Sequence, residues 1–206
     1  MGYGLAITSI SEKFKITNNL GYIGLIGVLF LIIYAYVSSL FISHGQIHNS
    51  IILAIGVIFF IKSYFKNPKK KEFRYFFLVF LILMIAAFIF KTHDDFKYYH
   101  FSYSYYLTEN PLIFGMGNYD LGYRTPSSIF YLNSLFYLPF VKYFMFHMPA
   151  ILIMGFSNLT LLIKLKKNLE NSQINFIFYF TLLVLIFINI FFIEYQSMEL
   201  TGQLKF

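Results

Sequence analysis

Long apolar runs separated by short polar segments make up most of the chain. A membrane-spanning helix needs about 20 mostly apolar residues, and five runs are near that length. They cover residues 20–42, 49–66, 73–91, 148–165 and 174–193. The pattern therefore predicts an all-α, polytopic integral membrane protein with about five transmembrane helices in a single domain, residues 1–206.

The segment 92–147, between the third and fourth runs, is the only sizeable region rich in polar residues. Its first part predicts an interfacial helix over about 95–107, because aromatic residues recur at helical spacing on one face. That face comprises Phe96, Tyr99, His100, Tyr103, Tyr106 and Leu107.

A second interfacial helix is predicted over about 126–138 and is too short to span a membrane. Thr125 can cap it, Pro126 suits its first position, and Pro139 ends it. Between the two helices, residues 108–124 are rich in Gly, Pro, Asn and Asp, which is typical of turns.

Composition agrees with a membrane location. The chain is 58% hydrophobic, its mean hydropathy is +0.66, and only 12% of its residues are charged, about half the usual share. Cysteine is absent, which excludes disulfides, thiolate metal sites and a cysteine nucleophile.

Basic residues predict the orientation, since Lys and Arg concentrate in cytoplasmic loops. Residues 66–74 and 164–171 hold such clusters, and placing both in the cytoplasm puts the N-terminus there too, in a cell (inner) membrane. Segments 43–49 and 92–147 are then external. The net charge of +7 reflects this topology and not a nucleic-acid-binding surface.

Two adjacent acids, Asp94 and Asp95, follow the third apolar run. One interpretation is helix capping, because Thr92 to Asp95 resembles a capping box. The other is a site, because paired carboxylates can hold a divalent cation such as Mg²⁺ or Mn²⁺, or act as a general base. Arg124 would be the natural partner for a phosphate. The residues alone leave both interpretations open.

The order of features in this loop resembles a known family. After the acidic pair come Tyr98 and Tyr99, a turn with glycines at 115–122, and the sequence Pro126-Ser127-Ser128 before an apolar stretch. This layout, over about residues 91–140, resembles the first external loop of the C-type (GT-C) glycosyltransferase superfamily. The chain looks most like a bacterial branch of that superfamily.

The resemblance implies transfer of a sugar from a polyprenyl-phosphate donor on the outer face of the membrane. Asp94 or Asp95 would be the catalytic base or a metal ligand, with Arg124 near the lipid phosphate. The other residues implied in substrate binding are His93, Tyr98, Tyr99, His100 and Asp120.

Members of that superfamily usually have more spans, so we expect this chain to be the N-terminal part of a longer transferase. The alternative is a non-catalytic transport or assembly component of the membrane, in which Asp94 and Asp95 cap a helix or bind a cation passively.

Other polar and small residues predict packing instead of chemistry. His44 and His48 are four residues apart, with the helix-breaking Gly45 between them. We expect them to be polar residues at the membrane interface and not metal ligands. Asn158 and Asn189 lie within apolar runs, where a polar side chain often bonds a neighbouring helix. The glycines at 21, 24 and 27 predict close helix packing.

Overall fold

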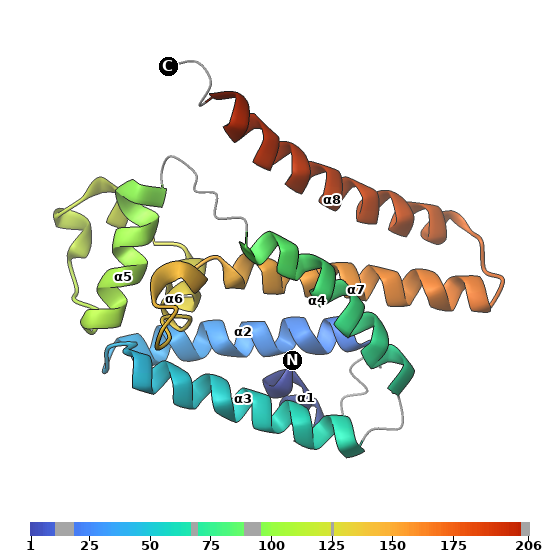
Figure 1. Ribbon diagram of the computed structural model, residues 1–206, viewed down its shortest axis with the longest axis horizontal. Helices are drawn as coiled ribbons and strands as arrows, with labels where there is room; N and C mark the ends of the chain where they lie inside the picture. The colour runs from blue at the N-terminus through green and yellow to red at the C-terminus, as the bar shows by residue number, and fades with distance from the viewer. Residues whose placement is uncertain (11–18, 67–69, 89–95, 125, 203–206) are drawn as a thin grey trace.

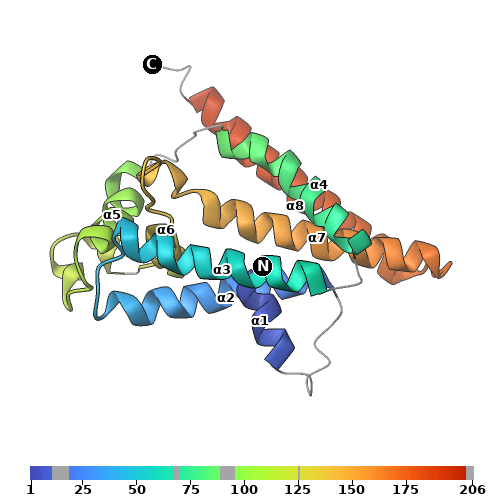
Figure 2. The same ribbon diagram turned by 60° about the horizontal axis from the view of Figure 1, so that its bottom comes forward.

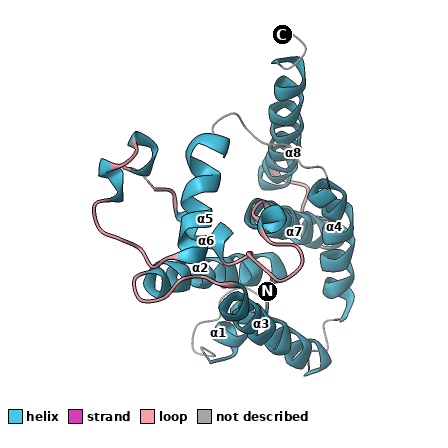
Figure 3. Cartoon of the chain, turned by 60° about the vertical axis from the view of Figure 1, so that its left-hand side comes forward, coloured by secondary structure: helices cyan, strands magenta, loops and turns pink. Residues whose placement is uncertain are grey.

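The computed structural model describes residues 1–10, 19–66, 70–88, 96–124 and 126–202. The described residues are almost entirely helical and contain no strand, which confirms the all-α prediction (Figure 3). The α-helices are α1 (Gly2–Ile10), α2 (Leu20–Ser39), α3 (Gln46–Lys66), α4 (Lys70–Phe88), α5 (Phe101–Glu109), α6 (Ser128–Ser134), α7 (Met148–Glu170) and α8 (Phe176–Gly202). Four single-turn elements are η1 (Phe96–His100), η2 (Met116–Asn118), η3 (Leu121–Tyr123) and η4 (Tyr143–Met145).

Helix α2 is central, with α7 running along it and α4 crossing α7 (Figure 1). Helix α1 contacts both α2 and α3 (Figure 2), and α8 packs on α7. Helices α5 and α6 gather at one end of this bundle, where α2 ends and α3 begins. The opposite end carries the start of α2 and the end of α7.

The close approach of α2 to α7 depends on glycine. A Cβ on Gly21 would overlap the backbone nitrogen of Thr160 and lie 2.7 Å from the carbonyl oxygen of Phe156. A Cβ on Gly24 would overlap the Phe156 ring, and Gly27 lies against Gly4 of α1. The predicted close packing at these three glycines is therefore confirmed, and their partners are α7 and α1.

Helix α8 is joined to α7 by a pair of amides. Asn158 Nδ2 donates to Asn189 Oδ1 at 3.0 Å, and Asn189 Nδ2 donates back to Asn158 Oδ1 at 3.1 Å. Both side chains are thereby satisfied between otherwise apolar helices, as the sequence predicted for these two residues.

Three stretches of described helix are long and apolar enough to cross a membrane: α2, α3 and residues 143–170. Helix α3 is almost unburied along its apolar part and exposes Ile51, Val57, Ile58 and Phe65. Water would be a poor solvent for such a continuous apolar face. Helices α4 and α8 form where the sequence predicts further spans, and α8 has a shorter apolar part, Phe176–Ile190.

The helix expected over 126–138 is shorter than predicted. Helix α6 covers Ser128–Ser134, and its N-cap is Ser127, whose Oγ accepts from the backbone N–H of Ile129. Pro126 therefore precedes the helix and does not occupy its first position. The chain leaves the helix before Pro139, in turns where Phe140 and Lys142 have positive φ.

Helix α6 is also buried, and not laid out on the surface of the bundle. Residues 130–137 are all inaccessible, because α6 is covered by α2, α5 and α7. The first predicted loop helix is present as η1 followed by α5, over 96–109. Of its predicted aromatic face, Tyr103 and Leu107 are buried.

Candidate functional site

A pair of tyrosines holds α5 against α6. The hydroxyls of Tyr103 and Tyr131 are 2.6 Å apart, and both side chains are buried. The ring of Tyr36, from α2, stacks on Tyr131 with the centroids 3.9 Å apart. Burial raises the pKa of Tyr103 and of Tyr131 above the ordinary value of 10.0, so both phenols stay protonated at neutral pH and act as hydrogen-bond groups.

This tyrosine pair lines one side of a hollow in the loop, with a volume of about 480 Å³. The remainder of the wall comes from the turn region that follows α5 and from the residues just before α6. The lining residues are Tyr103, Leu112–Asn118, Tyr123, Arg124, Pro126 and Tyr131. The wall is thus largely aromatic and apolar, with the amide of Asn118 and one cationic side chain.

Arg124 owes its position to the turn. Gly115 adopts φ +89°, which favours glycine, and the Oδ1 of Asp120 accepts from the N–H of Gly122 at 2.7 Å, capping η3. Arg124 follows η3 directly, and its Nε donates to the carbonyl oxygen of Gly117 at 3.2 Å. An exposed arginine anchored in this way presents a fixed positive charge beside the hollow.

Two of the other predicted site residues pack near this turn without lining the hollow. The rings of Tyr99 and His100 meet edge to face, with their centroids 4.4 Å apart. The centroid of the His100 ring lies 4.8 Å from that of Phe130. Gly122 approaches Tyr99 so closely that a Cβ would clash with it. Their contacts brace η1 against η3 and α6.

The remaining predicted residues divide into three groups. Tyr98 is 76% exposed and turns away from the packed side of η1. His93, Asp94 and Asp95 lie outside the described residues, so their capping and catalytic interpretations both stay predictions. Asp120 is a turn cap in the structure.

A buried polar cluster, which we call the His44 clamp, joins the α2–α3 turn to α6. It comprises Ser38, His44, Asn49 and Ser134. The His44 ring is fully buried, with Nε2 at 2.8 Å from the Oγ of Ser38 and Nδ1 at 2.6 Å from the Oγ of Ser134. The sequence placed His44 among polar residues at the interface, and the structure instead buries it inside the protein.

Asn49 is the other half of the clamp. Its Nδ2 lies within hydrogen-bond distance of three carbonyl oxygens, of His44 at 2.7 Å, Ser134 at 2.8 Å and Tyr137 at 3.0 Å. The neighbouring His48 bonds the hydroxyl of Tyr34 through Nε2 at 2.7 Å. The contacts of Asn49 with Ser134 and Tyr137 fix the C-terminal end of α6, and α6 forms one wall of the hollow.

Hydrogen bonding assigns the proton on His44. The Ser134 hydroxyl donates to the carbonyl oxygen of Tyr131 at 2.7 Å, so it accepts from Nδ1–H of His44, and Nε2 accepts from Ser38. Neutral imidazole supplies one donor and one acceptor, as this arrangement needs. Burial, with a smaller contribution from His48, lowers the pKa of His44 from 6.5 to about 4.

A family model with the description "Domain of unknown function (DUF8201)" matches residues 1–200. The chain belongs to this family. No curated protein and no solved structure matches the chain.

The His44 clamp predicts a pH dependence of stability. An unfolded chain keeps the ordinary histidine pKa of 6.5 and takes up the proton before the folded chain, whose His44 has a pKa of about 4. We therefore expect the free energy of unfolding to fall as the pH drops from 6.5 towards 4.

Unfolding of the full-length protein in nanodiscs, followed at several pH values, checks this expectation. His44→Gln should flatten the slope in that range, whereas His48→Gln should retain most of it, because burial is the larger cause of the lowered pKa of His44. An unchanged slope in His44→Gln would show that other groups cause the acid sensitivity.

Proposed function

We propose that this protein is an integral membrane protein of the cell (inner) membrane, crossed by about five helices with the N-terminus in the cytoplasm. Three described stretches have the required length and apolarity, and α3 turns its apolar side chains outward. Lys66 is the last residue of α3, and Lys164 and Lys167 fall in the last two turns of α7. Both helices end on the side of the bundle opposite α5 and α6 (Figure 1). The positive-inside rule makes that end cytoplasmic.

On this placement, the hollow lined by Tyr103, Arg124 and Tyr131 opens at the outer end of the bundle. We propose that it receives the phosphate and adjoining groups of a lipid-linked sugar, and that the protein acts in GT-C-like glycosyl transfer. The observation that carries this is one anchored guanidinium beside a cavity of about 480 Å³ with tyrosine and apolar walls. Arginine pairs well with phosphate, and aromatic and apolar walls suit sugar faces and prenyl chain.

The proposed reaction assigns a role to each group. An acceptor hydroxyl gives its proton to Asp94 or Asp95, and its oxygen bonds to the anomeric carbon of the donor sugar. The bond from that carbon to the phosphate oxygen breaks, and polyprenyl phosphate leaves with the electron pair. Arg124 stabilises the charge on this leaving group, and the two carboxylates would also suit Mg²⁺ or Mn²⁺.

Binding of polyprenyl phosphate tests the assignment of Arg124. The full-length protein in nanodiscs should bind polyprenyl phosphate more tightly than the uncharged polyprenol. Arg124→Gln should lower phosphate affinity by roughly ten- to a hundredfold, because a charge-assisted hydrogen bond contributes on the order of 1.5–3 kcal/mol. Lys142→Gln is the matched control, since Lys142 is exposed in the same loop and does not line the hollow.

Equal binding of polyprenyl phosphate and polyprenol, or an Arg124→Gln variant equal to the control, would contradict the proposal. Transfer from a polyprenyl-phosphate sugar then separates the two function classes. Loss of transfer in Asp94→Asn or Asp95→Asn, with donor binding retained, supports a transferase. Binding with no transfer by the parent protein supports a non-catalytic membrane component.

A further inference from the structure

A second hollow, which we call the basal hollow, lies at the opposite end of the bundle from Arg124. Its volume is about 690 Å³, and its walls come from the start of α2, the start of α4 and the end of α7. Three of its lining residues are lysines and two are glutamates. On the proposed orientation it opens at the level of the inner phospholipid head groups.

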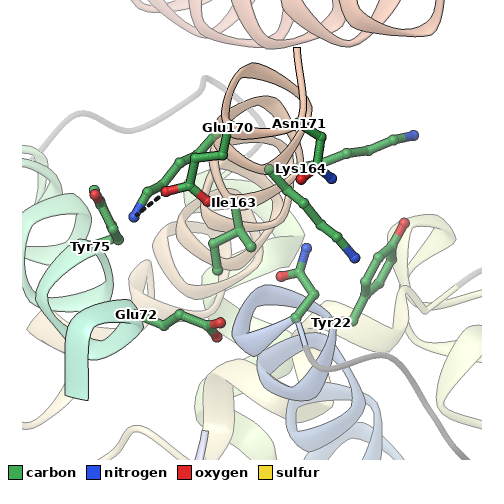
Figure 4. A pocket seen from close by; sticks show the side chains of 10 residues that line it. Tyr22, Glu72, Tyr75, Ile163, Lys164, Glu170 and Asn171 are labelled. Atoms are coloured by element: carbon green, nitrogen blue, oxygen red, sulfur yellow. Dashed lines mark ion pairs between the residues drawn. The ribbon is translucent and has the colours of Figure 1, made fainter. Parts of the chain in front are cut away.

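Two of these five charges compensate each other. Lys166 Nζ lies 3.5 Å from Glu170 Oε1 and 4.5 Å above the ring of Tyr75, and the ion pair is visible in Figure 4. Among the described residues, Lys164 and Lys167 form no ion pair. The basal hollow therefore has a net positive charge.

The fifth charged residue of the basal hollow is Glu72, on α4. Its Oε2 is buried and has no hydrogen-bond partner among the described residues. A buried carboxylate oxygen without a donor is unfavourable by an amount comparable to a lost charge-assisted hydrogen bond. Glu72 lines the basal hollow, so a cationic ligand there would stabilise the carboxylate as a whole.

Apart from the Lys166–Glu170 pair, Glu72 and Lys164 occupy different sides of the basal hollow. In Figure 4, Glu72 reaches in from α4 below Ile163, whereas Lys164 reaches down on the other side towards Tyr22. The wall beside Tyr22 is fixed, because the Asn19 side chain accepts from the N–H of Gly21 at 2.9 Å and donates to the carbonyl oxygen of Thr160 at 3.0 Å. The result is a built cavity with separate cationic and anionic sides.

We propose that the basal hollow binds the head group of a phospholipid that carries a primary ammonium, such as phosphoethanolamine. The phosphate pairs with Lys164 and Lys167, and the ammonium pairs with the Glu72 carboxylate. Basic pockets between membrane helices on the cytoplasmic side are suited to lipid phosphates. The inference rests on the proposed membrane placement and is independent of the chemistry at Arg124.

The carboxylate decides which head group is preferred. A primary ammonium has three N–H donors, while the quaternary ammonium of phosphocholine has none and phosphoglycerol carries no positive charge. All three head groups offer the same phosphate to Lys164. The preference among the three lipids therefore measures the contribution of Glu72. The total amount of phospholipid retained measures the contribution of the lysines.

Native mass spectrometry of the purified full-length protein tests the proposal, after delipidation and addition of phosphatidylethanolamine, phosphatidylcholine or phosphatidylglycerol. We expect phosphatidylethanolamine to be retained most. Glu72→Gln should lower its advantage by roughly tenfold, the effect of one charge-assisted hydrogen bond. Lys164→Gln should lower retention of all three lipids.

Matched controls are Glu109→Gln, at the far end of the bundle, and Lys66→Gln, at the same end but outside the basal hollow; both residues are exposed. Equal retention of the three lipids by the parent, or an unchanged preference in Glu72→Gln, would overturn the proposal. Competition by soluble glycerophosphoethanolamine that matches the lipid would show that the free head group is the ligand. Recovery of the protein without membranes would instead overturn the membrane placement.

Discussion

Asn49→Ala is expected to lower the free energy of unfolding by about 3 kcal/mol, because it removes the side-chain donor shared by three buried carbonyl groups. Asn49 is fully buried, and its Nδ2 serves the carbonyls of His44, Ser134 and Tyr137. The change also leaves a cavity where the amide was. Unfolding by denaturant in nanodiscs measures the loss.

The Asn49→Ala variant should also release the end of α6. Limited proteolysis between residues 138 and 147 should become faster than in the parent protein, because the clamp connects this part of the chain to α3. Arg124-dependent binding of polyprenyl phosphate should weaken in parallel, since Tyr131 of α6 lines the same hollow.

Two comparisons isolate the donor role of Asn49. Asn110→Ala changes an exposed asparagine in the same region and should alter stability by less than about 0.5 kcal/mol. Asn49→Asp keeps the shape but loses the amide donors, so it should be at least as destabilising as Asn49→Ala at neutral pH. A stable Asn49→Asp protein would contradict the clamp.

Gly21→Ala is the second change for which we expect a large effect, about 2–3 kcal/mol of lost stability. A Cβ at this position would overlap the backbone nitrogen of Thr160 and press on the carbonyl oxygen of Phe156 at 2.7 Å. Backbone atoms cannot rotate away, so α2 and α7 must separate. The separation also moves Asn19, which bonds α7 through Thr160.

Gly45→Ala is the matched control, because the nearest atom to a Cβ there is the carbonyl oxygen of Thr108 at 4.0 Å. The added Cβ would also overlap the hydroxyl of Thr160. Adding Thr160→Ala to Gly21→Ala removes this overlap but not the overlap with the backbone, so only part of the stability should return. Full recovery in the double variant, or equal stability of Gly21→Ala and Gly45→Ala, would show that the helices do not depend on backbone contact at this position.

Several features of the fold could be predicted because they are local. Hydropathy along the chain located the long helices, since an apolar run of sufficient length favours helix whatever surrounds it. The spacing of Gly21, Gly24 and Gly27 indicated a surface that another helix approaches closely. The isolated asparagines at 158 and 189 indicated a polar contact between helices, and the structure joins them to each other.

The start of α6 could not be predicted in the same way. Thr125 and Ser127 are both acceptable N-caps, and Pro126 suits a first helical position. The structure uses Ser127, and the following residues are committed to buried contacts with α2, α5 and α7. Tertiary packing selects among local alternatives that are nearly equal in energy.

The sequence by itself determined the helical class, the positions of the apolar helices, the turn around Gly115 and the charge asymmetry that favours one orientation. Only the tertiary structure decided which polar residues meet. His44 contacts a residue 90 positions away, Arg124 comes to lie beside Tyr103 and Tyr131, and Glu72 shares a hollow with Lys164. The reason is physical: hydropathy and propensity act over a few residues, whereas these sites depend on contacts between distant segments that form when the helices pack.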